Sequence, residues 1–167
     1  MKRIHLALAV PGIALLVAAG CGYSMRPLHR TDVRTVAVSI FASKEFRREL
    51  EFELTRQLVK FIELRTPYKV VHDPSRADTQ LRGEIVNLNA PTIVEDPDTD
   101  VPLDIEVTLT CWFEWKDLRT GEILARRDHI SGSATYATAV GETLDSATVE
   151  ASSRLAERIV EAMETEW

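Results

Sequence analysis

Residues 103–116 alternate between apolar and polar side chains, and this run constrains the fold more than any other feature of the chain. The apolar positions are Leu103, Ile105, Val107, Leu109, Cys111, Phe113 and Trp115. A period of two places successive side chains on opposite faces of a β-strand. The run therefore predicts a long strand with one face buried, Cys111 included, and the other facing water or a partner.

Other segments predict the layers around this strand. Apolar residues at three- and four-residue intervals predict two amphipathic helices, one after Ser43 and one after Gly141. Further strands are expected at residues 34–41, 68–72, 80–95 and 122–138. The apolar parity changes after Ile85, which predicts a bulge or bend near residues 87–89. The predicted fold class is α+β, a two-layer sandwich of a mostly antiparallel sheet of four to five strands with two amphipathic helices on one face.

The N-terminal segment predicts a lipid anchor at Cys21. A basic start precedes about twelve apolar residues, or about 18 Å of helix, which is too short for the roughly 30 Å hydrocarbon core. The small residues before Cys21 resemble the bacterial lipobox, in which the cysteine sulfur receives a diacylglyceryl group before cleavage. We expect residues 1–20 to be a cleaved lipoprotein signal peptide, residues 21–33 a lipidated tether and residues 34–167 a single domain. The alternative is an ordinary signal peptide that contains a cysteine.

The mature chain is expected to be acidic, with one further cysteine. Removal of Lys2 and Arg3 with the signal peptide changes the net charge from −6 to −8, which argues against nucleic acid as a partner. Lipidation of Cys21 leaves only Cys111, so no intramolecular disulfide is expected. No later apolar stretch is long enough to span a membrane. Gly22, where an Asp would signal retention in the inner membrane, favours the outer membrane with the domain facing the periplasm.

Motifs for catalysis or cofactor binding are absent from the sequence. The chain contains no GxSxG, HExxH, CxxC, Walker loop or GxGxxG. His72 and His129 each adjoin an Asp that could orient an imidazole, but a strand-end histidine and an exposed one are the simpler interpretation. The acidic loop at residues 95–100 has the first, third and fifth aspartates of an EF-hand, yet Val101 stands where glycine is needed. We therefore predict no enzyme activity, no catalytic residue, no cofactor and no metal site.

Two surface features are candidates for partner binding. Trp112 lies on the polar face of the alternating strand, opposite the expected helices, and exposed tryptophans often anchor interfaces. The alternative is a tryptophan covered by its cross-strand neighbours. Basic residues cluster beside the tether, at Arg26, His29, Arg30 and Arg34. Each would contribute about 1 kcal/mol near anionic lipid, although a solvated face is the simpler interpretation.

Several short segments occur in an order that resembles a known family. They are Cys21-Gly22-Tyr23, Thr35-Val36-Ala37-Val38, the helix with Leu50, Leu54 and Leu58, and residues 77–85. Together they resemble the LptE family of lipopolysaccharide-assembly lipoproteins over nearly the whole mature chain. The resemblance implies an outer-membrane lipoprotein, acylated with fatty acids such as palmitate. It also implies that the chain plugs the β-barrel LptD, supports its assembly and interacts with lipopolysaccharide or a related envelope lipid.

The physical properties of the predicted domain bear on this role in two ways. A polar sheet face is compatible with the polar lumen of a barrel. The acidic net charge, by contrast, is not what phosphate-rich lipopolysaccharide favours. No residue is therefore assigned to bind lipopolysaccharide, and the lipid-attachment residue Cys21 is the only site residue carried over from the resemblance. The alternative function is a free-standing, periplasm-facing lipoprotein that acts as an assembly or binding factor for another envelope or secretion complex.

Overall fold

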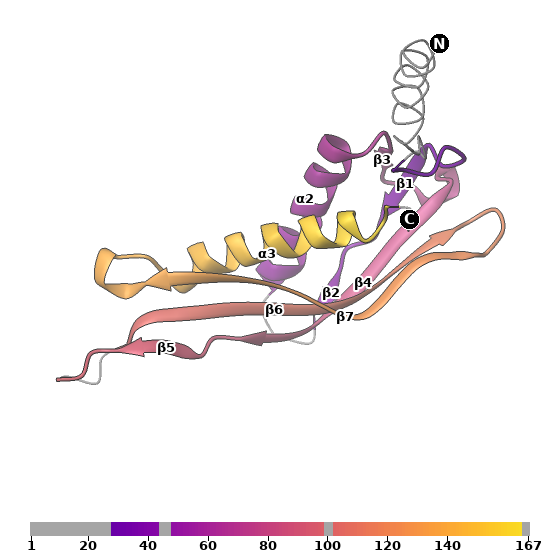
Figure 1. Ribbon diagram of the computed structural model, residues 1–167. Helices are drawn as coiled ribbons and strands as arrows, with labels where there is room; N and C mark the ends of the chain where they lie inside the picture. Colours follow the sequence, from indigo (N-terminus) through magenta and orange to yellow (C-terminus); the bar gives the residue numbers. More distant parts are fainter. Residues whose placement is uncertain (1–27, 44–47, 99–101, 165–167) are drawn as a thin grey trace, which may run out of the picture.

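Two α-helices lie on one face of a seven-stranded sheet in the described part of the chain (Figure 1). The computed structural model describes residues 28–43, 48–98 and 102–164. The predicted signal peptide, Cys21 and most of the predicted tether lie outside these residues. The predicted α+β architecture, with two layers and both helices on the same face, is confirmed.

The sheet is more mixed than the sequence predicts. Its strands are β1 (Thr35–Val38), β2 (Ala42–Ser43), β3 (Lys69–Val71), β4 (Thr79–Asn89), β5 (Thr92–Glu95), β6 (Pro102–Asp117) and β7 (Ile123–Ala137). β4, β5 and β7 pair antiparallel with β6, whereas β1 is parallel to β3 and β4, and β2 is parallel to β4. The described strands therefore number seven instead of four to five. The parallel pair β1 and β3 follows from the helix between them, because a helical crossover returns the chain in the same direction.

Both amphipathic helices that the sequence predicts are present. α2 spans Arg48–Arg65 and stops before Pro67, which disfavours helical backbone at the residue preceding it. α3 spans Leu144–Glu161, and the hydroxyl of Thr143 caps it by accepting the Ser146 N–H at 3.3 Å. The guanidinium of Arg65 at the end of α2 pairs with Glu157 and Glu161 of α3. These ion pairs join the two helices across their exposed side.

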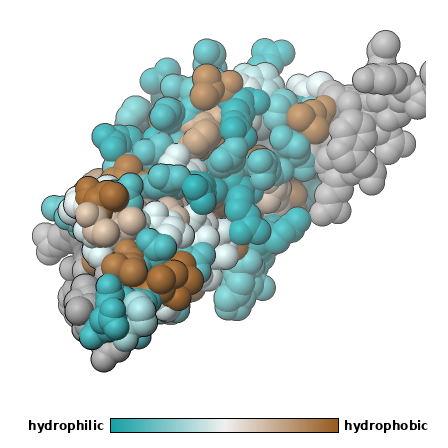
Figure 2. Space-filling view, turned by 60° about the vertical axis from the view of Figure 1, so that its left-hand side comes forward, coloured by the Kyte–Doolittle hydropathy of each residue, from teal (hydrophilic) through white to brown (hydrophobic). Residues whose placement is uncertain are grey.

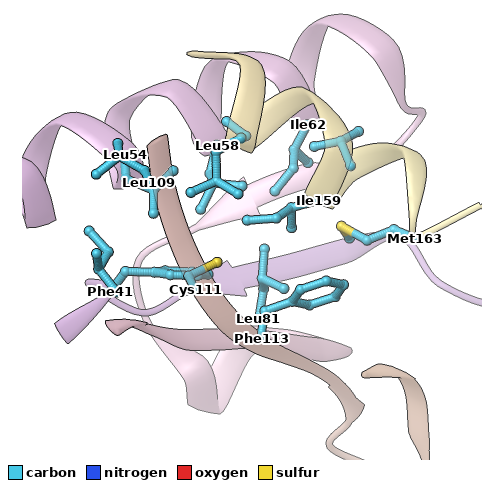
Figure 3. Packing of buried hydrophobic residues seen from close by; sticks show 14 of the residues in the cluster. Phe41, Leu54, Leu58, Ile62, Leu81, Leu109, Cys111, Phe113, Ile159 and Met163 are labelled. Atoms are coloured by element: carbon cyan, nitrogen blue, oxygen red, sulfur yellow. The ribbon is translucent and has the colours of Figure 1, made fainter. Parts of the chain in front are cut away.

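The core lies between the helices and the alternating strand. Leu109, Cys111, Phe113 and Trp115 of β6 are at most 1% exposed, as the period of two predicts. In Figure 3 the labelled side chains of the sheet point toward those of α2 and α3. The helix residues in this core include Leu54, Leu58 and Ile62 of α2 and Ile159 of α3, and all four are fully buried. Burial raises the pKa of the Cys111 thiol to about 12.

Two irregularities shape the long strands. The register of β4 against β6 shifts between Ile85 and Asn87, which confirms the predicted bulge slightly earlier in the chain than expected. After the shift Leu88 pairs with Leu109 and packs against the core. The predicted strand 80–95 is divided in two at residues 90–91, where Pro91 has no backbone N–H to donate, although its carbonyl still accepts the N–H of Glu106 at 3.1 Å.

Helix α3 also closes the outer edge of β7. Arg154 Nη1 donates to the carbonyl of Ser133 at 3.0 Å, and Arg158 donates to the carbonyl of Ser131. Between them, Gly132 lets the helix approach closely, because a Cβ there would lie 2.4 Å from the backbone nitrogen of Leu155. Guanidinium groups thus occupy edge carbonyls that a foreign strand would otherwise bind.

Candidate partner-binding surface

The sheet face away from the helices carries a charged network across three strands. The register places Arg82 of β4 and Arg126 of β7 on either side of Glu114 of β6. Arg82 donates to Glu114 Oε1 through Nε at 3.1 Å and Nη2 at 2.9 Å, and Arg126 Nη1 lies 3.9 Å from Glu114 Oε2. Glu114 is only 5% exposed, and the two neighbouring cations offset the loss of its solvation.

Trp112 lies next to this network on the same face. It is directly opposite Glu84 in the register, and its indole N–H donates to Glu84 Oε2 at 3.0 Å. The side chain is half-buried, so cross-strand neighbours cover part of the ring and leave part of it accessible. The structure therefore places Trp112 away from both helices. Its role in partner binding stays a prediction.

A bulge in β7 creates a hollow around Trp112. Between Cys111 and Phe113 the register of β6 against β7 shifts, so β7 carries an additional residue at Asp128 and His129. The hollow has a volume of about 470 Å³. It is lined by Arg82, Val86, Trp112, Glu114, Arg126, Asp128 and His129. Tryptophan and arginine are the residue types most enriched at interface hot spots, so this hollow has the composition of a protein-binding surface.

The histidines proposed as a weak catalytic alternative are not brought together. His72 follows β3, while His129 lies in the β7 bulge. The neighbouring carboxylates have other partners: Asp73 accepts the Ser75 N–H at 2.9 Å, and Asp128 accepts the Nε–H of Arg126 at 3.0 Å. Neither Asp–His pair forms the arrangement that would orient an imidazole for proton transfer.

Within the described residues there is also no candidate metal-binding group and no helix that could span a membrane. Within them, no group of three or more His, Cys, Asp or Glu side chains is placed to hold a metal ion. In the acidic loop Asp96 accepts the backbone N–H of Asp98 at 2.9 Å, while Asp100 lies outside the described residues. No helix in the described ranges is both long enough and apolar enough to cross a membrane.

The end of the sheet that carries β5 has a different surface. No Lys, Arg or His occurs in the sequence between Arg82 and Lys116, so the charges here are all acidic. Large apolar side chains are also exposed there, at Ile93 and Val94. Figure 2, in which this end comes forward, shows hydrophobic side chains gathered among hydrophilic ones. This end is acidic and partly apolar, in contrast to the arginine-containing hollow around Trp112.

Sequence reasoning identified Trp112 but missed the residues that position it. Glu84, Arg82 and Arg126 belong to different strands, and only their pairing places them beside one residue. The sequence did contain one indication of these neighbours, namely polar side chains at alternate positions of adjacent predicted strands. The register needed to use that signal depends on bulges in both β4 and β7.

Solved structures with the same fold define the class of this domain. A PelC L103M dodecamer from Paraburkholderia phytofirmans has a TM-score of 0.53 at 14% identity, covering 83% of this chain and 94% of that chain. An uncharacterized lipoprotein B from Nitrosomonas europaea has a TM-score of 0.55 at 12% identity, covering 84% and 88%. A hypothetical protein from Chlamydia trachomatis has a TM-score of 0.52 at 10% identity, covering 78% and 93%. The class is thus a small α+β domain with the fold that these three structures share.

The family follows from the sequence itself. The family model described as "LptE: Lipopolysaccharide-assembly" matches residues 33–163, which is most of the chain. The chain belongs to the LptE family, and the resemblance noted from its short segments is confirmed. Among curated proteins, no sequence matches this chain.

Proposed function

We propose that this protein is an outer-membrane lipoprotein that plugs an LptD-type β-barrel and assists its assembly. The family match over residues 33–163 is the observation that carries the proposal. In this role the protein is anchored through acylated Cys21, faces the periplasm and binds its partner without catalysis. Lipopolysaccharide or a related envelope lipid is the cargo of the complex.

The helix-free sheet face supports this role physically. A barrel lumen is polar, and this face presents charged side chains whose partners are already in place around Glu114. Trp112 adds an aromatic anchor that is held in one orientation by Glu84. The charged side chains of this face already form ion pairs with one another. The face can therefore bind the polar inner surface of a barrel without leaving a buried charge unpaired.

Co-purification tests the proposal. The acylated protein, expressed at its native level and extracted in mild detergent, is expected to bring down a β-barrel identified by mass spectrometry as LptD-type. Trp112→Ala is expected to lower recovery of that barrel. Phe52→Ala is the matched control, because Phe52 is an exposed aromatic residue on α2, on the other layer of the domain.

Two outcomes would contradict the proposal. Recovery of the protein without any barrel favours the alternative, a free-standing lipoprotein that serves another envelope or secretion complex. Equal loss of the barrel in the Trp112 and Phe52 variants would move the interface away from the helix-free face. Cys21→Ser tests placement separately, since it is expected to abolish incorporation of labelled palmitate while the domain keeps its thermal unfolding transition.

A further inference from the structure

A second hollow lies beside β1 and β3, at the start of the described chain. Its volume is about 550 Å³, and Leu28 and Pro67 contribute apolar surface to it. Cationic side chains, Arg34 and Lys69, line it as well. A hollow lined by both apolar and cationic side chains is complementary to an amphiphile with an anionic head.

The two cations are adjacent and available. The backbone N–H of Lys69 in β3 donates to the carbonyl of Arg34 at 2.9 Å, which places Arg34, the residue before β1, next to Lys69. Both residues are exposed, and neither forms an ion pair with another described residue. The positive charge of this pair is therefore free to meet an external anion.

The carboxylates close to the hollow have partners of their own. Asp32 Oδ1 lies 3.4 Å from Nε of Arg30, another residue that lines the hollow. Asp78 accepts the backbone N–H groups of Arg34 and Thr35 at 2.9 and 3.0 Å, and these bonds lower its pKa. The carboxylates next to the hollow are thus engaged by Arg30 and by the backbone rather than by the side chains of the cationic pair.

The position of the hollow in the chain points to a bilayer. Leu28 lies seven residues after Cys21, and seven extended residues reach at most about 25 Å. Attraction between surface charges and anionic lipid falls off within a Debye length of about 8 Å at physiological salt. An acylated Cys21 would therefore leave the hollow free to come within this distance of the headgroups.

The opposite end of the domain has the reverse charge. Figure 1 shows β5 at the end of the sheet that is far from β1 and β3. Glu95 and Asp96 follow one another at that end, and Asp104 and Glu106 lie on the adjoining part of β6. An anionic bilayer therefore attracts the end with the hollow and repels the other, which distinguishes the two ends of the domain.

We propose that the hollow beside β1 and β3 binds the phosphate headgroup of an anionic phospholipid in the leaflet that holds Cys21. Arg34 and Lys69 pair with the phosphate, while Leu28 and Pro67 contact the glycerol and the first methylenes. The site orients the domain on its membrane, with the acidic end directed away. This inference rests on the proposed lipidation of Cys21, and it concerns the surrounding leaflet, not the transported cargo.

Vesicle binding tests the site without the anchor. Residues 21–167 with Cys21→Ser are mixed with phosphatidylcholine vesicles that either contain or lack phosphatidylglycerol, and bound protein is measured by flotation. Binding is expected only to the anionic vesicles, and it should weaken as salt is raised. Because each cation contributes about 1 kcal/mol, Arg34→Gln with Lys69→Gln should lower the affinity about 30-fold. Arg56→Gln with Lys60→Gln on α2 removes the same charges from an exposed site elsewhere and should leave binding almost unchanged.

Four results would overturn the site. They are equal binding to neutral vesicles, equal loss in the control pair, displacement by inorganic phosphate alone, and tighter binding of lipopolysaccharide vesicles through the same two cations. Thermal unfolding of each variant shows that a loss of binding is not a loss of fold. Palmitate labelling and barrel recovery are measured on other variants. A negative vesicle result would therefore not contradict the proposed binding to a barrel. A failure to recover the barrel would likewise not change the interpretation of the vesicle result.

Discussion

Trp112 and Trp115 lie on opposite faces of strand β6, and each donates its indole N–H to a side chain of β4. Trp112 donates to Glu84 at 3.0 Å on the helix-free face, whereas Trp115 donates to Thr79 at 2.9 Å within the core. The two residues share a strand, a residue type and a type of bond. They differ in burial, because Trp115 is 1% exposed and Trp112 is accessible in its hollow.

This pair separates binding from stability. Trp115→Ala is expected to cost about 3–5 kcal/mol of unfolding free energy, because it leaves a large cavity in the core. Trp112→Ala should cost much less and should weaken barrel binding more than any change in its stability explains. Urea unfolding and barrel recovery measure the two effects. A larger loss of stability for Trp112 than for Trp115 would identify Trp112 as a structural residue.

The buried row of β6 should not tolerate charge. Leu109→Asp puts a carboxylate in a fully buried position within the apolar core, and its desolvation cost rivals the whole stability of a small domain. We expect the variant to lack a cooperative thermal transition in circular dichroism. Thr110→Asp, one residue further on the other face, is the control and should fold. A folded Leu109→Asp variant would show that the core tolerates a charge at this position.

Gly132 should be required for the contact between β7 and α3. In Gly132→Ala the new methyl group would lie 2.4 Å from Leu155 N and 2.6 Å from Ala151 O, which are backbone atoms that cannot turn aside. We expect destabilisation of about 1–3 kcal/mol, the usual cost of overpacking, measured by urea unfolding. Ser133→Ala, which keeps the carbonyl that binds Arg154, should change stability little. Equal effects of the two substitutions would mean that the helix can move away from the strand.

Asp117 should make the unfolding free energy of the domain depend on pH in the acidic range. Its carboxylate accepts hydrogen bonds from the Arg119 side chain and the Thr120 N–H, and these lower its pKa from 3.8 to about 2. A pKa lowered by folding adds stability above the unfolded value, and that stability is lost as the pH falls through the folded value. The stability difference between the wild type and Asp117→Asn should therefore shrink between about pH 4 and pH 2. Urea unfolding at each pH measures this difference in unfolding free energy. A difference that does not change with pH would show that this carboxylate does not stabilise the turn.

Cys111 should be inert in the native state. Burial raises its pKa to about 12, so the reactive thiolate is scarce at neutral pH. In the Cys21→Ser chain we expect an aromatic disulfide reagent to modify Cys111 only at the rate of unfolding, and rapidly in denaturant. Fast modification of the folded protein would mean that the core around β6 opens locally.

Part of this fold could be predicted from the spacing of residues, because the information is local. The parity change after Ile85 predicted a bulge, and the structure has one before Asn87 that returns Leu88 to the core side. The order of strand, helix and strand around α2 also contained a signal for parallel pairing, which the antiparallel prediction overlooked. The short strand β2 gave no periodic signal, since Ala42 and Ser43 pair with β4 over only two residues.

The sequence by itself determined the two layers, the buried row of β6 and the opposite placement of Trp112, because side-chain alternation depends only on strand geometry. Tertiary structure alone decided which residues surround Trp112. Glu84, Glu114 and Arg126 are brought together by strand register, and that register depends on bulges and on the packing of three strands at once. The backbone hydrogen bond between Lys69 and Arg34 likewise arises from the parallel pairing of β1 with β3, two strands on either side of a helix. Both candidate sites therefore depend on pairing between segments that are distant in the sequence, and local periodicity does not predict such pairing.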